Sequence, residues 1–301
     1  AGHRVLAVGA ARAVGVGVGR AERLGLGRVG VGQARRGVGV VGGGHPRRLP
    51  LAAVFVTFAS DYGHQDEFVG VCHGVIIGLA PVARVIDVTH GIPRHDVRFG
   101  AIVLRNALPF MPAGVHLAVV DPQVGGTRRA VALRCAQEER LLVGPDNGLL
   151  LPAAERFGGV VEAVDIGRSR WRLEPVSATF HGRDIFAPVA AHLALGKPLI
   201  GEPVDDLVRL PELTPRTEGE TRIVHAVEID GFGNVITNAE LPGRDVTVNG
   251  HPAVIGRTFA DAPPGGLVIY EDAGGDVAIA VNGGSAAALL NVRAGDELRL
   301  A

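Results

Sequence analysis

The sequence predicts an α/β domain with a mostly parallel sheet, followed by a small all-β domain that resembles a barrel. As far as residue 203, short β-branched strands alternate with helical segments. From residue 221 onward, short strands follow one another between Gly, Pro, Asn and Asp. The first fifty residues differ from both parts in composition. We therefore expect a tail (1–50), an α/β domain (51–203), a linker (204–220) and a β-domain (221–301).

The tail is rich in glycine and arginine. It holds 14 of the 44 glycines, and its nine arginines face a single acid, Glu22, a balance of +8. Residues 51–301 hold 21 basic and 30 acidic residues, a balance of −9. Ordering so many glycines is entropically expensive and little apolar bulk offsets it, so we expect disorder or a mis-annotated extension. Two GxGxxG matches, at 25–30 and 37–42, would indicate a nucleotide-dependent oxidoreductase, but they lack the flanking strand and acid of that motif.

In the α/β domain, β-branched runs predict the strands, and apolar residues at helical spacing predict the helices. The strands are expected at 54–59, 85–88, 115–120, 130–134, 140–143 and 160–164. The helices are expected at 67–79, 97–107, 147–157 and 185–195. Pro81, Pro109 and Gly196 follow three of these helices, as expected for helix ends.

The β-domain is predicted from six short strands, at 223–229, 234–238, 246–248, 267–270, 277–281 and 297–300. Such runs, separated by turn residues, are typical of a small antiparallel barrel or sandwich.

Composition excludes several classes of protein. A net charge of −1 argues against a dedicated nucleic-acid binder. Two cysteines, Cys72 and Cys135, form no CxxC pair and suggest no disulfide scaffold. No apolar run is long enough for a membrane span, so we expect a soluble, cytoplasmic protein.

The densest group of polar residues is VVDPQVGGTRR, in which Asp121 ends a strand and Arg128 and Arg129 follow a glycine-containing loop. Ligands of parallel sheets bind at the carboxyl ends of strands, where Asp61 and His90 also fall. An Asp beside an Arg can orient a water or a substrate hydroxyl, and the alternative is a loop salt bridge.

Three further segments combine charged or aromatic residues with glycine. In TFHGRD, His181 is a candidate acid–base group or a structural histidine, and Asp184 can serve as an acid at a helix start. In DYGHQDE, the acids Asp61 and Asp66 can bind a ligand or cap a helix. In DGFGN, the Asp-Gly pair is good hairpin chemistry, whereas an aromatic residue is less expected there.

A metal site at His90, His95 and Asp96 is possible from spacing. Neither an HExxH nor a CxxC motif supports it, so we expect no metal.

Several motifs occur in the order found in one family: DYG, DEFVG, HGVI, VIDVTHGIPRHDVRFGA, VVDPQVGGTRR, GPDNGLL, TFHGRDIFAP, EIDGFGNVITN and VNGGSAA. From about residue 54 to 300, the sequence resembles the S-adenosyl-L-methionine (SAM) hydrolases, also called SAM hydroxide adenosyltransferases. The SAM-dependent fluorinases and chlorinases are relatives of this family.

The resemblance implies a homotrimer that binds SAM between the α/β domain of one subunit and the β-domain of the next. Water attacks C5′ of the ribose and displaces L-methionine, giving adenosine; SAM is the substrate and no cofactor is needed. The implied catalytic residues are Asp121 to orient the water and accept its proton, Arg128 as electrostatic stabiliser, and His181 as orienting group. The halogenases carry Tyr in place of Asp121, and the fluorinase carries Ser in place of Gly182.

The resemblance also implies a set of substrate-binding residues. Asp61 would bind the ribose diol, Asp66 and Asp230 would lie near the methionine ammonium, and His95 replaces a tryptophan of the fluorinase pocket. Those implied around the adenosine are Phe180, Phe232, Asn234, Asn282 and Gly283.

The sequence departs from the family pattern at a few positions. Gln123 replaces a glycine, His73 replaces a lysine, and SDYG stands for TDFG. Two alternatives to hydrolysis stay open: a SAM-dependent halogenase, and a sensor that binds SAM or adenosine without turnover.

Overall fold

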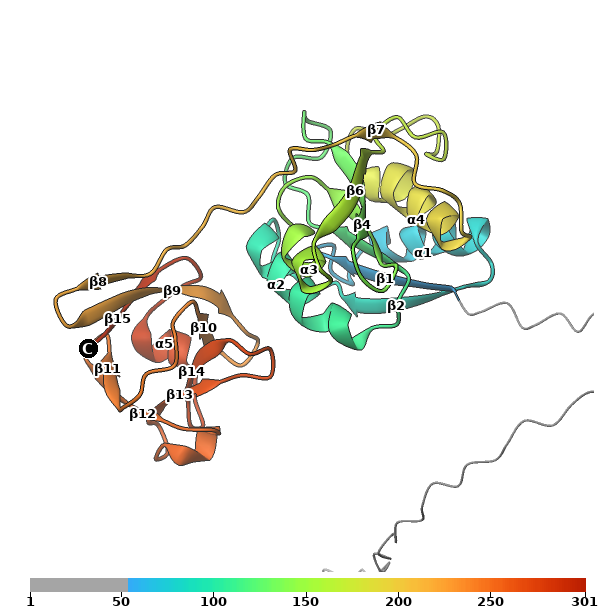
Figure 1. Ribbon diagram of the computed structural model, residues 1–301. Helices are drawn as coiled ribbons and strands as arrows, with labels where there is room; N and C mark the ends of the chain where they lie inside the picture. Colours follow the sequence, from blue (N-terminus) through green and yellow to red (C-terminus); the bar gives the residue numbers. More distant parts are fainter. Residues whose placement is uncertain (1–53) are drawn as a thin grey trace, which may run out of the picture. The chain divides into compact units, whose positions relative to one another are not determined.

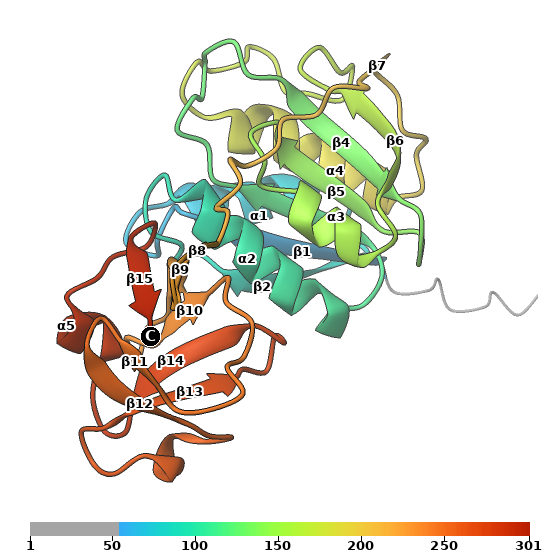
Figure 2. The same ribbon diagram turned by 60° about the vertical axis from the view of Figure 1, so that its left-hand side comes forward.

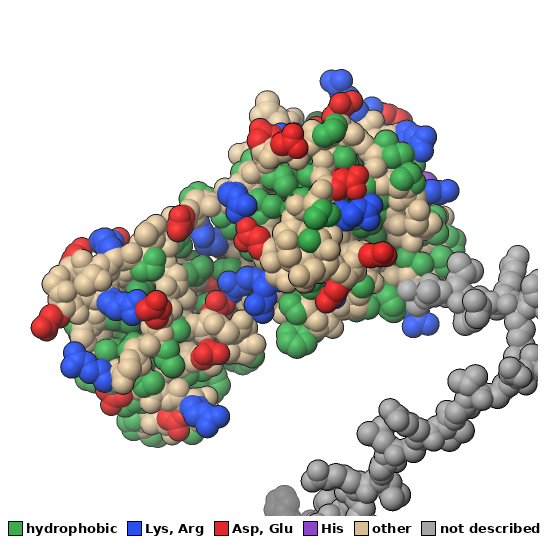
Figure 3. Space-filling view, viewed as in Figure 1, with side chains coloured by type: hydrophobic (Ala, Val, Ile, Leu, Met, Phe, Trp, Pro, Cys, Tyr) green, Lys and Arg blue, Asp and Glu red, His purple; other side chains and the backbone are tan. Residues whose placement is uncertain are grey.

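The structure is a computed structural model that describes residues 54–301 (Figure 1). The tail expected at residues 1–50, with its two glycine motifs, lies outside the described residues. Within residues 54–301, no helix has the length and apolar character needed to cross a membrane. On the visible face of these residues, acidic and basic side chains are interspersed rather than gathered by sign (Figure 3).

The first part is an α/β domain with a seven-stranded sheet in the order β2-β1-β3-β5-β4-β6-β7. Strands β2, β1, β3 and β5 run parallel, whereas β4, β6 and β7 form an antiparallel edge. The strands are β1 (Val54–Ser60), β2 (Ala83–Thr89), β3 (Val115–Val119), β4 (Ala130–Cys135), β5 (Leu141–Pro145), β6 (Val160–Asp165) and β7 (Glu202–Pro203). The predicted α/β class is confirmed.

Helices cover both faces of this sheet (Figure 2). Helices α1 (Phe68–Leu79) and α4 (Ala187–Ala194) pack with Phe58 in one core, and α2 (Val97–Ala107) and α3 (Leu151–Arg156) pack with Leu142 in the other. Because both faces are covered, the central strands are largely apolar: all five residues of β3 are buried, and His116 is the polar one among them.

The second part is a β-barrel. Seven strands close into a ring because β10 pairs with β9 as well as with β14, and β8 extends the sheet beyond β9. Only β12 and β13 pair in parallel within this ring. The strands are β8 (Arg216–Glu218), β9 (Thr221–Ile229), β10 (Val235–Thr237), β11 (Val246–Val248), β12 (His251–Ile255), β13 (Leu267–Glu271), β14 (Val277–Val281) and β15 (Glu297–Leu300).

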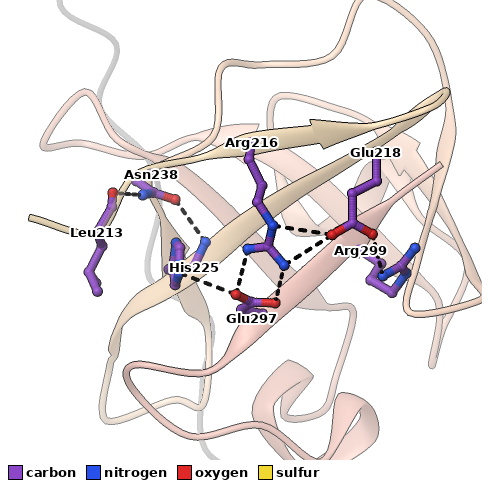
Figure 4. A network of polar contacts seen from close by, with 7 residues as sticks. All are labelled: Leu213, Arg216, Glu218, His225, Asn238, Glu297 and Arg299. Atoms are coloured by element: carbon purple, nitrogen blue, oxygen red, sulfur yellow. Dashed lines mark hydrogen bonds and ion pairs between the residues drawn. The ribbon is translucent and has the colours of Figure 1, made fainter.

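Ion pairs fasten the added strand β8 to the barrel (Figure 4). Arg216 donates to both carboxylate oxygens of Glu297 on β15, at 2.5 and 2.8 Å. Glu218 accepts from Arg216 and from Arg299 at 3.2 Å. The side chains are half exposed, so these ion pairs add little stability. Their main effect is to set the register of β8 on the barrel.

Several features of the fold differ from the sequence prediction. The helix expected at 147–157 begins only at Leu151, because Asn147 uses its side chain for local turn bonds and Gly148 has a positive φ of 93°. The helix expected at 185–195 is preceded by a π-helical turn, Gly182–Phe186. The expected linker 204–220 contains β8, and β12 and the short helix α5 (Ala286–Leu290) were not predicted.

Candidate active site

A cleft of about 290 Å³ lies at the carboxyl ends of the parallel strands. Asp61 follows β1 and Asp121 follows β3, and because these strands are neighbours in the sheet their carboxylates reach the same cleft. The other side chains and backbone positions that line it are Tyr62, Phe68, Arg94, His95, Val119, Val124, Thr179 and Gly182. A larger hollow of about 540 Å³, between α3 and β6, contains none of the predicted catalytic residues.

Asp121, Arg128 and His181 form one hydrogen-bonded chain. Arg128 Nε donates to the two carboxylate oxygens of Asp121 at 2.9 and 3.0 Å, and Arg128 Nη2 also contacts this carboxylate. The same Nη2 lies 2.8 Å from His181 Nδ1. Only 4% of the Arg128 side chain and 5% of the Asp121 side chain are exposed, so the pair is shielded from water and strongly coupled.

His181 is held as a neutral imidazole. Burial and the neighbouring Arg128 guanidinium lower the pKa of His181 from its ordinary value, outweighing the acids nearby. Because a guanidinium can only donate, the Nδ1 atom facing it must accept, and the ring proton is therefore assigned to Nε2. The ring lies at the start of the π-helical turn, an irregularity that is frequent at functional sites.

An aromatic cluster forms one wall of the cleft. Phe180 meets Tyr62 and Phe68 edge to face, with ring centroids 5.9 and 5.1 Å apart. Burial raises the pKa of Tyr62 well above its ordinary value, which keeps its hydroxyl protonated. A Cβ at Gly182 would overlap that hydroxyl, so the chain needs glycine at this position.

Asp61 is anchored beside the cleft by the loop that follows β2. Its Oδ2 accepts a hydrogen bond from the His95 backbone N–H at 2.9 Å, and His95 adopts a positive φ of 66° there. Asp66 is exposed and does not line this cleft. The structure therefore brings Asp61, His95 and Asp121 together and leaves Asp66 outside the set.

A second hollow, of about 440 Å³, lies in the β-barrel and has mostly apolar walls. Phe232, Asn234, Asn282 and Gly283 all line it, as does Phe259, which was not predicted. Asp230 does not line it, but it accepts from the Asn234 side-chain N–H₂ at 2.7 Å and so orients that amide. An aromatic ring that is 84% exposed beside an oriented amide suits a flat, hydrogen-bonding group such as a nucleobase.

Tyr62, Arg94 and Thr179 line the first cleft but were not predicted as site residues. Arg94 is the one a sequence argument could have found, because it stands in the same post-strand loop as His95. Tyr62 and Thr179 stand in the segments DYGHQDE and TFHGRD, beside Asp61 and His181, but only the meeting of separate loops brings both into the cleft.

Gln123, where the family pattern has glycine, needs no unusual backbone conformation in the loop between Asp121 and Arg128. Gln123 is exposed, and it is not among the described residues with a positive φ. Its carbonyl accepts from Gly126 N–H at 2.9 Å, which closes the turn between Asp121 and Arg128. The position that does require glycine is Gly125, with a φ of 75°, where a Cβ would strike the Ala178 carbonyl.

The metal set considered from sequence, His90, His95 and Asp96, does not come together. His95 lines the cleft, whereas Asp96 caps α2 by accepting from Phe99 N–H at 2.9 Å. His90 is buried, with Nδ1 2.7 Å from Ser60 Oγ.

The fold and site define a two-domain protein with a shielded, hydrogen-bonded chain of charged residues at the strand ends of an α/β domain and a mostly apolar groove in a β-barrel. Models of the N-terminal and C-terminal domains of the SAM hydroxide adenosyltransferases match residues 56–201 and 224–299, and the chain belongs to this family.

Named relatives agree with this assignment. The (R)-S-adenosyl-L-methionine hydrolase of Salinispora arenicola is 54% identical over 257 residues, covering 82% of this chain and 97% of its own. A fluorinase of Nocardia brasiliensis is 28% identical, covering 80% of this chain and 94% of its own. A crystal structure of an uncharacterized conserved protein from Thermotoga maritima superimposes with a TM-score of 0.73 at 36% identity, covering 81% of this chain and 99% of its own.

Proposed function

We propose that the protein hydrolyses SAM to adenosine and L-methionine by in-line attack of water on the ribose C5′. The observation that carries this proposal is the shielded chain from Asp121 through Arg128 to His181 beside a strand-end cleft. The sulfonium is already an excellent leaving group, so the enzyme mainly has to place one water in line with the C5′–S bond. Asp121 orients that water and accepts its proton, Arg128 stabilises hydroxide character, and His181 holds the guanidinium in place.

Hydrolysis fits this site better than halide transfer. An anionic carboxylate at the nucleophile's position attracts the hydrogens of water and repels a halide ion. Gly182 also leaves no space for a serine side chain, because Tyr62 occupies it. Relatives named as hydrolases are more similar to this chain than those named as fluorinases.

The decisive experiment incubates the purified protein with SAM and separates the products. The name of the Salinispora relative specifies the R epimer, so the R and S sulfonium epimers are assayed separately. Adenosine and L-methionine in equal amounts are expected. A 5′-halo-5′-deoxyadenosine formed with added halide would identify a halogenase, and binding without any product would identify a sensor.

The control variants are Asp121→Asn and Asp121→Ala. Removing the carboxylate leaves the buried Arg128 unpaired, which destabilises a protein by about 3–5 kcal/mol, so Asp121→Asn is the better-matched change. Folding of both is checked by circular dichroism. Product formation is expected to fall at least about a hundredfold in either variant; an active Asp121→Asn protein would contradict the proposal.

The proposed working form is a cytoplasmic homotrimer that needs no cofactor, with each site shared by two subunits. In support, the predicted substrate residues line two separate hollows, one in the α/β domain and one in the barrel. Light scattering gives the mass of the assembly, and turnover in the presence of a chelator tests the need for metal.

Shared sites can be tested by mixing subunits. Asp121→Asn carries an inactive catalytic chain, and Asn234→Ala carries a damaged barrel groove. If one site takes residues from two subunits, assemblies formed from both variants regain part of the activity that neither has alone. Mixtures as inactive as their components would refute shared sites.

A further inference from the structure

Three side chains of the α/β domain that the proposed reaction does not use converge on one point. His73 lies on α1, Asp87 on β2, and His90 directly after β2. His73 Nε2 is 2.8 Å from Asp87 Oδ1, and His90 Nε2 is 3.0 Å from the same oxygen. All three possible ligand atoms lie within 4.8 Å of one another.

His90 is buried and its Nε2 faces Asp87, yet this nitrogen lacks a hydrogen bond. The residue has no exposed surface, and Ser60 Oγ occupies its Nδ1 at 2.7 Å. Its Nε2 lies 3.0 Å from Asp87 Oδ1, yet it has no hydrogen-bond partner among residues 54–301. An orphan polar atom in a buried position calls for a partner.

A divalent transition-metal ion meets this need. Zn²⁺ binds imidazole nitrogen and carboxylate oxygen at about 2.0–2.2 Å, and tetrahedral geometry at that bond length puts ligand atoms about 3.3 Å apart. The two nitrogens lie 2.8 and 3.0 Å from Asp87 Oδ1, so small side-chain shifts would suffice to admit an ion. Ser60 would orient the ring from behind, as partners of metal-binding histidines do.

The cluster also has a route for an ion to enter. The side chains of His73 and Asp87 are 32% and 39% exposed, so an ion can arrive from solvent and keep a water as fourth ligand. His64 packs its ring against His90, with centroids 5.3 Å apart, and is the nearest further imidazole.

We propose that His73, Asp87 and His90 bind one Zn²⁺-like ion, which fastens α1 to β2 behind the strand-end cleft. The ion is structural and takes no part in the proposed hydrolysis. The alternative is that Asp87 only hydrogen-bonds His73 and lies beside His90, and that the cluster binds no metal.

The test uses protein without a histidine tag, stripped by a chelator and titrated with Co²⁺ and Zn²⁺. We expect one equivalent of Co²⁺ to produce visible absorption bands of a coordinated ion, and Zn²⁺ to displace it and raise Tm. Neither a band nor a Tm shift with metal in excess over protein would overturn the proposal.

His73→Gln and His73→Lys are the informative variants, because His73 is partly exposed and its loss does not open the core. Lysine can still pair with Asp87, but its ammonium cannot coordinate a metal. Both variants are expected to keep the Tm of the stripped protein, to bind the ion at least about tenfold more weakly, and to lose the metal-induced rise in Tm. His251→Gln, at an exposed histidine of the barrel, should bind like the unmodified protein. If His73→Gln binds as tightly as the unmodified protein, the assigned ligands are wrong.

Discussion

Gly182 packs so closely against Tyr62 that a single added carbon at Gly182 would overlap the tyrosine hydroxyl. Both residues line the cleft that holds Asp121. The backbone at the start of the π-helical turn therefore packs closely against the aromatic wall, and the space beside Asp121 depends on both.

Gly182→Ala should lower kcat/KM for SAM about tenfold or more, because Tyr62 must move and reshape the cleft. The matched variant is Gly182→Ala combined with Tyr62→Phe. Without the hydroxyl, the next atoms lie 3.1 and 3.4 Å from the new carbon, so part of the activity should return. Equal activity of the single and double variants would show that this overlap does not matter.

Arg128→Lys should reduce kcat about a hundredfold, because a single ammonium cannot hydrogen-bond Asp121 and His181 in the geometry of the planar guanidinium. Arg129→Lys is its neighbouring control. Arg129 pairs with Asp146 and Asp206 instead, so its replacement is expected to lower Tm without changing kcat. Steady-state kinetics and thermal melts of the two variants would separate these effects, and similar kcat values would contradict the role given to Arg128.

His116 predicts a loss of stability in acid. It is buried between Thr57 and Arg140, and burial, aided by the Arg140 charge, lowers the pKa of His116 to about 3. The unfolded chain takes up a proton near pH 6.5, whereas the folded chain does not until about pH 3. The stability that depends on neutral His116 is therefore fully present above pH 6.5. Below that pH, the free energy of unfolding falls by about 1.4 kcal/mol per pH unit. Urea unfolding at pH 7.5, 6 and 5 should show a shallower decline for His116→Asn, even though this variant is less stable at pH 7.5.

Glu228 predicts an effect of the opposite sign in the barrel. Burial raises the pKa of Glu228 to about 7, so the folded state favours the protonated acid. The stability that depends on protonated Glu228 is fully present below pH 4.5 and is lost as the pH rises to about 7. Glu228→Gln should stabilise the protein by about 1–3 kcal/mol at pH 8, and this advantage should vanish near pH 4.5. An advantage that is the same at both pH values would rule out ionisation as its cause.

Phe232→Ala should weaken adenosine binding about tenfold, because an exposed ring of this kind stacks on a base with about 1–3 kcal/mol. Calorimetric titration with adenosine measures the loss. Tm should stay unchanged, since the ring is 84% exposed and supports no core. Unaltered affinity would mean that the barrel groove does not hold the base.

The strands and most helices could be predicted because local patterns decide them. The helix at Val97–Ala107 was predicted with both ends correct, and its N-terminus is set by the Asp96 cap. The late start of α3 was missed because the Asn147 side chain accepts from Leu149 N–H in a local turn and donates to the Val120 carbonyl in a distant segment. β12 was missed as well, although its neighbours on both sides of the sheet were found.

Like the fold, the candidate site has features that the local sequence predicts and features that depend on long-range contacts. The sequence by itself determined the residue types of the candidate site: Asp61 and Asp121 stand out as polar residues after buried strands, and His181 stands out in a charged segment before a helix. Only the tertiary structure decided that one guanidinium joins Asp121 to His181, that Tyr62 leaves room only for glycine at 182, and that His73 meets Asp87 and His90. The physical reason is range: turns and periodicity depend on near neighbours in the chain, whereas these contacts join residues 3 to 120 positions apart through the pairing of strands and the packing of helices on the sheet.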